Sequence, residues 1–452
     1  MTGLTLFLAN AHRSAFAALL PPLMDRLSLT PSAGGALQAA MLTGYLAAQV
    51  PAGRWADAWG GPRVLLWSCA GWSAATALTA LAVWRAAAAE AAAGPWPMAA
   101  LVAARFLFGA ASAGVMPCVA AMAVRWVPAR ERAASTSLVY AAFNLGGVAA
   151  LAWAPGVAES AASGATGALL ALGALGAAWA AAGGAWLQAM VRGLPLADAG
   201  DNRKGRRASK GGGGGGGGRA LAGLLPRPAD RDSAREVFTL CFTHGAMGCG
   251  FFLLSGLMPL ILASIGGAAG GGAGAPSSLT ALPWLAAAAT GVLSGRAADA
   301  AIARGVPALR VRRAFQVASF ALCALSALAL AAPNAAERAA ALFSGACPRA
   351  LAAAALAANL VAYSLSFGGF HPYLQDVAGS ANAGTLQGLT NSVSICGGAA
   401  ATLLCGWAGE AHGGYGAAFA ALAALYAAAA GVWAWGARGA RVRLLEEEEE
   451  AG

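Results

Sequence analysis

Long apolar runs separated by short polar links repeat along the whole chain. Each run is roughly 20 residues or longer, which is the length that an α-helix needs to cross the hydrocarbon core of a bilayer. The pattern predicts an all-α polytopic membrane protein with twelve transmembrane helices in two six-helix halves. The predicted helices cover residues 4–24, 34–55, 63–84, 97–124, 133–155 and 164–191 in the first half, and 235–265, 277–301, 311–332, 339–366, 380–407 and 414–437 in the second.

Composition agrees with this pattern and argues against a soluble protein. Hydrophobic residues make up 59% of the 452 positions and charged residues only 11%, well below the share of charge in soluble domains. The eight cysteines form no CxxC pair, so no metal site is expected. Because HExxH, GxSxG and paired carboxylates within the apolar runs are also missing, we do not expect an enzyme or a bound cofactor.

The polar residues divide the chain into four parts: a first half at 1–191, a linker at 192–234, a second half at 235–437 and a charged tail at 438–452. The linker holds a basic cluster and then an unbroken glycine run from Gly211 to Gly218, which is typical of a flexible segment. A phosphate-binding glycine loop is the alternative, but no strand precedes the run and no GK[ST] motif follows it. The basic cluster allows weak binding of anionic membrane lipids.

Arginines gather on one side of the predicted membrane, and this asymmetry sets the orientation. The net charge of +10 comes mainly from short links and the linker, so we expect orientation rather than nucleic-acid binding. Both termini should therefore face the cytosol or its topological equivalent. The links after the second, fourth and eighth runs carry Arg54, Arg63, Arg125, Arg130, Arg132, Arg304, Arg310, Arg312 and Arg313, and the tail carries Arg438, Arg441 and Arg443.

An internal repeat relates the two halves. Gly53-Arg54-Trp55-Ala56-Asp57 follows the second run, and Gly295-Arg296-Ala297-Ala298-Asp299 follows the eighth. Parallel six-helix repeats place a substrate site near the membrane midplane between the halves, with alternating access by rocking one half against the other. The repeat thus predicts a transporter. A rigid hairpin at the membrane surface is the alternative interpretation of residues 53–63.

The repeated Gly-x-x-x-Asp link in a six-plus-six chain resembles the major facilitator superfamily, and more specifically its anion:cation symporter family. That family includes plant and algal plastid phosphate transporters, vesicular glutamate carriers and sialic acid carriers. The resemblance covers nearly the whole chain apart from the linker and tail. The passages that carry it are Gly44 to Leu65, Arg105 to Pro117, Arg125 to Arg132 and Leu138 to Pro155, with weaker matches at Gly295 to Asp299, Gln375-Asp376 and Gly388 to Asn391.

Two arginines are the candidate ligands for an anionic substrate. Arg13 lies well inside the first predicted helix, where an ionised side chain costs about 2.5–3.5 kcal/mol on insertion scales and should therefore face a cavity or a partner. Arg105 starts the Arg-Phe-Leu-Phe-Gly run of the fourth helix. Paired guanidinium groups suit phosphate or carboxylate through bidentate hydrogen bonds. The alternatives are an Arg13 that snorkels to a helix end and an Arg105 that holds neighbouring carbonyls.

The resemblance adds further site residues and one departure. Tyr45, Asn144 and Asn391 fall in helices that line the cavity in the family, although bonding between helices explains such residues equally well. Where relatives carry a glutamate seven residues after the fourth-helix arginine, this chain has Ser112, which cannot take up a proton near neutral pH. His12, His244, His371 and Asp376 are the remaining titratable candidates, and a structural role was the leading expectation for each. The residues predicted to latch the cytosolic gate are Gly53, Arg54, Asp57, Arg63, Gly295 and Asp299.

The resulting prediction is a monomeric secondary transporter of a small anion, with inorganic phosphate first and H+ or Na+ as the coupling ion. An organic anion such as a dicarboxylate or ascorbate is the alternative substrate. A relative that no longer transports and acts as a nutrient sensor is the alternative of another class, which the loss of the glutamate at position 112 keeps open. The resemblance allows a plastid membrane, and other endomembranes or the plasma membrane remain open.

Overall fold

The computed structural model describes residues 1–88, 96–160, 164–193, 226–264, 277–331, 348–412 and 415–445. Within these residues the first half contains α1 (Thr2–Arg26), α2 (Pro31–Trp59), α3 (Gly61–Ala88), α4 (Trp96–Ser112), α5 (Val115–Trp126), the 3-10 turn η1 (Ala129–Glu131), α6 (Arg132–Ser160) and α7 (Gly164–Gly193). The second half contains β1 (Arg227–Pro228), α10 (Arg231–Ser264), α11 (Ser277–Ala303), α12 (Ala308–Ala331), α14 (Pro348–Ser364), the 3-10 turn η2 (Leu365–Phe367), α15 (Phe370–His412), α16 (Gly416–Gly436) and β2 (Leu444–Leu445).

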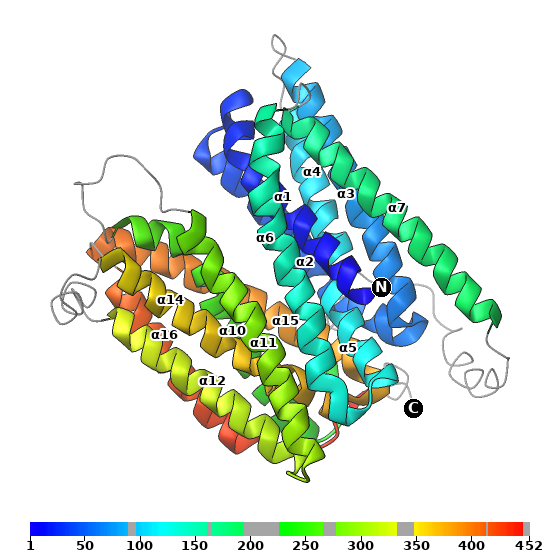
Figure 1. Ribbon diagram of the computed structural model, residues 1–452, viewed down its shortest axis with the longest axis vertical. Coiled ribbons are helices and arrows are strands. Elements are labelled where there is room, and N and C mark those ends of the chain that lie inside the picture. The colour runs from blue at the N-terminus through cyan, green and yellow to red at the C-terminus, as the bar shows by residue number, and fades with distance from the viewer. Residues whose placement is uncertain are drawn as a thin grey trace.

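The helices form two bundles, α1–α7 and α10–α16, which lie side by side (Figure 1). Inside the first bundle α1 packs on α6, α2 on α4 and α3 on α7, while inside the second α10 packs on α15 and α12 on α16. Across the two bundles the main contacts join α2 to α15, α5 to α15 and α6 to α11. In the described residues, eight helical stretches are long and apolar enough to cross a membrane, and the long helices α1, α2 and α11 complete the bundles.

Local sequence explains where the helices begin and end. The side chain of Thr30 accepts a hydrogen bond from the N–H of Ala33 at 3.3 Å, and Pro31 takes the first helical position of α2. After α11 the N–H of Val306 bonds the carbonyl of Ala301 and that of Gly305 bonds the carbonyl of Ile302, which is the hydrogen-bond pattern of a Schellman motif. Gly60 after α2 and Gly305 after α11 have φ of 91° and 92°, so left-handed glycines end both copies of the repeat.

Two predicted helices differ in shape from the observed ones. The predicted helix at 97–124 is split into α4 and α5 at residues 113–114. The predicted helix at 339–366 extends further, because α14 continues through η2 into the first turns of α15 and breaks only at Gly379, whose φ is 67° and ψ −176°. The chain then returns as residues 380–412. Residues 341–347 and the glycine run 211–218 lie outside the described residues.

The α2–α3, α5–α6 and α11–α12 links lie at one end of the molecule, which we call the link end. Residues 437–445 fold back across this end of the second bundle, where Arg313 Nε donates to the carbonyl of Ala437 at 2.7 Å and β2 pairs antiparallel with β1. Asp230 accepts hydrogen bonds from the N–H of Ser233 at 2.8 Å and from the Arg443 guanidinium at 2.7 Å. The pKa of this carboxyl is lowered by the Ser233 bond first and also by Arg443. The acidic run 446–450 lies outside the described residues.

Candidate functional site

The first copy of the repeat joins α2 to α15 across the two bundles. A Cβ atom on Gly53 would collide with the carbonyl oxygen of Gly384, so glycine permits the close approach of the two helices. One helical turn later, the Asp57 carboxylate accepts hydrogen bonds from the N–H groups of Gly384 at 2.8 Å and Thr385 at 2.7 Å, and from the Thr385 hydroxyl at 2.8 Å. Hydrogen bonds to an ionised acceptor are stronger than neutral ones. The carboxylate thereby ties the end of α2 to the start of the returning part of α15.

The second copy repeats this geometry between α11 and α6. A Cβ on Gly295 would meet the carbonyl oxygen of Ala133 and the side chain of Ser137. One turn later, Asp299 accepts hydrogen bonds from the N–H of Ala134 at 2.8 Å and of Ala133 at 3.4 Å, in the first turn of α6. A carboxylate is favourable there because the free N–H groups and the helix dipole present positive charge. Each half therefore supplies an aspartate that holds a helix of the other half.

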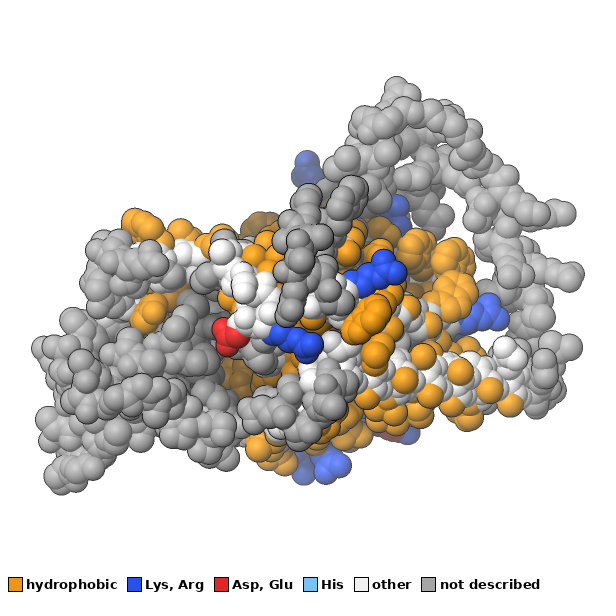
Figure 2. Space-filling model, turned by 90° about the horizontal axis from the view of Figure 1, so that it is seen from above, with side chains coloured by type: hydrophobic (Ala, Val, Ile, Leu, Met, Phe, Trp, Pro, Cys, Tyr) orange, Lys and Arg blue, Asp and Glu red, His pale blue; other side chains and the backbone are white. Residues whose placement is uncertain are grey.

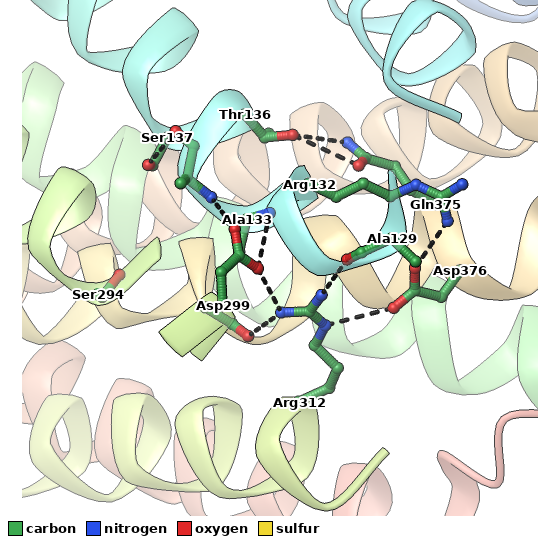
Figure 3. A network of polar contacts seen from close by, with 12 residues as sticks. Ala129, Arg132, Ala133, Thr136, Ser137, Ser294, Asp299, Arg312, Gln375 and Asp376 are labelled. Atoms are coloured by element: carbon green, nitrogen blue, oxygen red, sulfur yellow. Dashed lines mark hydrogen bonds and ion pairs between the residues drawn. The ribbon is translucent and has the colours of Figure 1, made fainter. Parts of the chain in front are cut away.

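A network of charged side chains surrounds the second copy (Figure 3). The guanidinium of Arg312 is fully buried and lies 3.8 Å from Asp299 and 3.3 Å from Asp376. Arg132 reaches Asp376 from the other half, with Nη1 to Oδ1 at 2.8 Å. Because buried charges are tolerated only when they are paired and hydrogen-bonded, this network holds the two halves together at the link end. The link end is thus closed in this structure.

The other two residues predicted at this gate lie on the outer part of the first bundle. Arg54 is half-buried on α2, one turn before Asp57, and Arg63 stands at the start of α3. Arg63 lines a groove of about 800 Å³ between α3 and α7, together with Trp67 and small apolar residues. This groove lies within the first bundle, away from the junction of the halves. Trp59, which is 48% exposed, packs against both Trp55 and Trp67 with ring centroids 5.6 Å apart, as in an aromatic belt at a membrane surface.

Arg105 lies deep in the first bundle, and no carboxylate of the described residues forms an ion pair with it. It is 2% exposed, and its guanidinium lies over the rings of Phe16 at 3.8 Å and Phe108 at 4.8 Å. Its Nε and Nη2 atoms find no hydrogen-bond acceptor among the described residues. A buried guanidinium with unpaired donors is costly unless an anion completes its surroundings. This unsatisfied cation is the strongest sign of an anion-binding site in the described part of the chain.

Arg105 is connected to the junction of the two halves through Arg13, Tyr45 and Asn391. Arg13 on α1 lies within electrostatic range of both Arg105 and Tyr45. The Tyr45 hydroxyl of α2 accepts a hydrogen bond from Asn391 Nδ2 of α15 at 3.4 Å. The structure therefore brings together four of the five residues predicted to bind substrate, from four helices and both halves.

The fifth predicted residue, Asn144, lies on α6 one turn after Tyr140, which places both on one face of the helix. Arg13, Tyr45, Tyr140 and Asn144 are all half-buried. The hydrogen bonds and ion pairs seen in the described residues do not connect Asn144 to the other four.

The structure brings Tyr140 and His371, which belong to opposite halves, into direct contact, and the sequence did not predict this contact. Their rings lie 4.8 Å apart, between α6 and the start of α15. The only signal in the sequence was the family-like passage around Tyr140. Ser112, which stands where relatives carry a glutamate, donates its hydroxyl to the carbonyl of Phe108 at 2.7 Å and so bonds its own helix.

Comparisons with known proteins show the family of the chain. The sequence profile of the Major Facilitator Superfamily matches residues 2–402. "Probable anion transporter 3, chloroplastic" of Arabidopsis thaliana is 27% identical over 401 residues, which are 86% of this chain and 70% of that protein. Two other proteins of Arabidopsis thaliana match over 148 residues, or 33% of this chain: "Sodium-dependent phosphate transport protein 1, chloroplastic", 31% identical over 27% of its length, and "Ascorbate transporter, chloroplastic", 29% identical over 25% of its length.

Among solved structures, the proton:xylose symporter XylE bound to 6-bromo-6-deoxy-D-glucose superposes with a TM-score of 0.66 at 14% identity. The match covers 98% of this chain and 96% of that chain. At this identity the likeness concerns the fold, and the sugar of that complex has no bearing on the substrate here.

Proposed function

The chain belongs to the Major Facilitator Superfamily, and on this premise we propose that it moves a small anion, inorganic phosphate first, across a membrane by alternating access. Membership makes it a multi-pass membrane transporter and not an enzyme. The relatives named anion transporter support the anionic class of substrate. The named phosphate transporter among them supports phosphate as the first candidate.

The observation that carries the proposal is the buried guanidinium of Arg105, whose Nε and Nη2 atoms lack an acceptor among the described residues. Arg13 lies within electrostatic range of it, so two positive charges lie near one another. An anion between them would accept charge-assisted hydrogen bonds that the protein leaves unmade, each worth about 1.5–3 kcal/mol. The aromatic contacts of Arg105 hold its planar group in a fixed orientation, which lowers the entropy lost on binding.

The two repeat copies act in this proposal as a gate at the link end. Asp57 and Asp299 hold helices of the opposite half while the link end is closed, and both must release when it opens. Such paired arrangements supply the two-state element that alternating access requires. Coupling to an H+ or Na+ gradient would provide the driving force.

The arginine-rich link end faces the cytosol or its topological equivalent in this proposal. Seen from the opposite end, the described surface carries many hydrophobic side chains and several separate basic ones (Figure 2). The chloroplastic relatives favour a plastid membrane. We expect the chain to work as a monomer.

Ascorbate or another organic anion is the second candidate substrate, favoured by the relative named ascorbate transporter. Both substrates offer oxygen atoms to guanidinium groups, so the arginines alone do not separate them. The test uses liposomes that contain the purified protein in their membrane and unlabelled phosphate inside. Labelled phosphate added outside should enter these liposomes by exchange. Liposomes without protein are the control, and unlabelled ascorbate or malate outside is the competitor.

We expect saturable uptake of phosphate that excess ascorbate reduces little. Uptake of labelled ascorbate without uptake of phosphate would select the second candidate. Failure of correctly inserted protein to exchange any of these anions would overturn the proposed function.

A further inference from the structure

We propose that His371 binds the coupled proton of this transporter, so that the coupling ion is H+ rather than Na+. The inference rests on the proposed function and assigns a role to a residue outside the predicted binding set. Its ring is 2% exposed, and neither Nδ1 nor Nε2 has a hydrogen-bond partner among the described residues. An imidazole ring binds a proton through one of these nitrogen lone pairs, while Na+ prefers oxygen ligands.

The position of His371 connects it to movement between the halves. Its ring stacks on Phe367 of the same half at 5.0 Å and meets Tyr140 of the opposite half at 4.8 Å. It lies in the first turn of α15, five residues before the gate residue Asp376. Separation of α6 from α15 would remove Tyr140 and admit water to the ring, so protonation of His371 is tied to the opening of this junction.

The closed link end disfavours a protonated His371 for physical reasons. A charged imidazolium has two N–H donors, and both would lack acceptors here. Arg312 bonds the nearby Gly368 carbonyl at 3.3 Å and so places a positive charge close to the first turn of α15, where His371 lies. The proton therefore leaves when the link end closes around the ring and enters when water and a counter-charge are present.

The anion site supplies that counter-charge. His371 contacts Tyr140 at the junction of the halves, and Asn391 of the same helix, α15, bonds Tyr45 of the predicted anion site. An anion bound at this site would add negative charge along the same junction and so favour protonation of His371. By thermodynamic reciprocity, protonation would strengthen binding of the anion to the same extent.

The carboxylates near the junction of the halves are engaged in other contacts, which leaves the histidines as candidates. Asp57 and Asp299 hold backbone groups, and Asp376 is paired with two arginines. His12 lies inside the first bundle and bonds Thr76 at 3.0 Å, away from the junction. The titratable or charged groups on elements packed around His371 are Tyr140 on α6, His244 on α10, Asp299 on α11, Arg312 on α12, Tyr363 on α14 and Asp376 on α15.

The test compares His371→Gln with the parent and with His12→Gln as the matched buried-histidine control. Phosphate exchange is measured in liposomes at equal pH on both sides, and net accumulation is measured under an imposed pH gradient in sodium-free buffer. We expect His371→Gln to retain exchange within about threefold but to lose accumulation by about tenfold or more, the range of typical coupling energies. His12→Gln should accumulate phosphate like the parent. A pH-sensitive dye should show proton entry with phosphate in the parent and in His12→Gln, and none in His371→Gln.

Several outcomes would overturn the proposal. One is unchanged accumulation by His371→Gln, and another is loss of exchange together with accumulation in both His371→Gln and His371→Asn. Parent protein driven by sodium and indifferent to pH would also overturn it, without any variant. Absence of phosphate and ascorbate exchange in the parent would instead mark failure of the proposed function itself.

Discussion

At the scale of single residues, two aspartates have equivalent roles that the repeat alone did not specify. Asp57 accepts three hydrogen bonds from Gly384 and Thr385, and Asp299 accepts two from Ala133 and Ala134. In both cases most of the donors are backbone N–H groups, which no side-chain motif reveals. The carboxylate form is essential because an amide accepts through only one of its two terminal atoms.

Asp57→Asn should weaken the closed link end while leaving the fold intact. The variant loses the charge and one of the two carboxylate oxygens that accept hydrogen bonds from the backbone N–H groups of Gly384 and Thr385, which costs about 1–3 kcal/mol in favour of the open state. We expect slower phosphate exchange at saturation with an unchanged half-saturating concentration, and faster hydrogen exchange at the amides of Gly384 and Thr385. A change in apparent affinity alone, with normal maximal rate, would contradict the role of Asp57 in the gate.

At the scale of elements, glycines decide how closely helices of opposite halves approach. Gly53 faces Gly384 between α2 and α15, and Gly388 faces the carbonyl of Gln49 on the same pair of helices. Gly295 plays the same part between α11 and α6. Because packed backbones cannot yield by the width of a methyl group without moving a whole helix, the closed state depends on these positions.

Gly53→Ala should prevent full closure of the link end. The added Cβ would collide with backbone atoms of Gly384 and Thr385 rather than with a flexible side chain, so we expect loss of most phosphate exchange. Gly35→Ala on the same helix is the matched control, since a Cβ there meets nothing within 4 Å. That control should exchange normally and gain about 0.5–1 kcal/mol of helix stability, visible as a slightly higher melting temperature. Equal activity of both variants would contradict the close-approach account.

Much of the architecture followed from hydrophobic periodicity, because membrane helices need long apolar runs. The all-α fold in two six-helix halves is confirmed by the family match and by the solved structures of the same fold. The tenth helix was predicted to end at 366, before the polar residues His371, Gln375 and Asp376. The structure buries His371 and Gln375 at the junction of the halves and partly buries Asp376, and Gln375 bonds Thr136 at 3.1 Å. Such pairing depends on residues far away in sequence, so a local pattern cannot indicate it.

Part of the candidate anion site was also predictable from the apolar runs. A charged residue within an apolar run is conspicuous, and so Arg13 and Arg105 stood out. That Arg105 lies over Phe16 and lacks acceptors for two of its donors required the packed structure. The partners of the gate aspartates were equally hidden, because they are N–H groups of the opposite half. The roles of all these residues in transport stay predictions.

At the scale of the whole molecule, the two halves are joined at the link end by charge as well as by close packing. Arg132 of the first half pairs with Asp376 of the second, and Arg312 lies between Asp376 and Asp299 (Figure 3). These bonds must break together if the link end opens. Their cooperative loss would make the molecule switch between two states rather than deform gradually.

Arg132→Gln should shift this balance toward the open link end. The substitution removes a charged hydrogen bond between the halves and leaves Asp376 paired with Arg312 alone, so we expect the closed state to lose about 1.5–3 kcal/mol. We expect faster hydrogen exchange in residues 129–136 and 370–378. The control is Arg130→Gln, because the Arg130 side chain is 72% exposed and pairs with Glu131 at the surface. If residues 129–136 and 370–378 of Arg132→Gln exchange their amide hydrogens as slowly as in the parent, Arg132 does not help to close the link end.

The central claim is that Arg13 and Arg105 together bind the transported anion between the halves. Its most direct test is equilibrium binding of labelled phosphate to purified protein, compared among the parent, Arg13→Gln, Arg105→Gln and Arg130→Gln. Loss of one charge-assisted contact of about 1.5–3 kcal/mol predicts a dissociation constant raised about 10- to 100-fold in each of the first two variants. Arg130→Gln should bind as the parent does. Unchanged phosphate affinity in properly folded Arg13→Gln and Arg105→Gln protein would contradict the account.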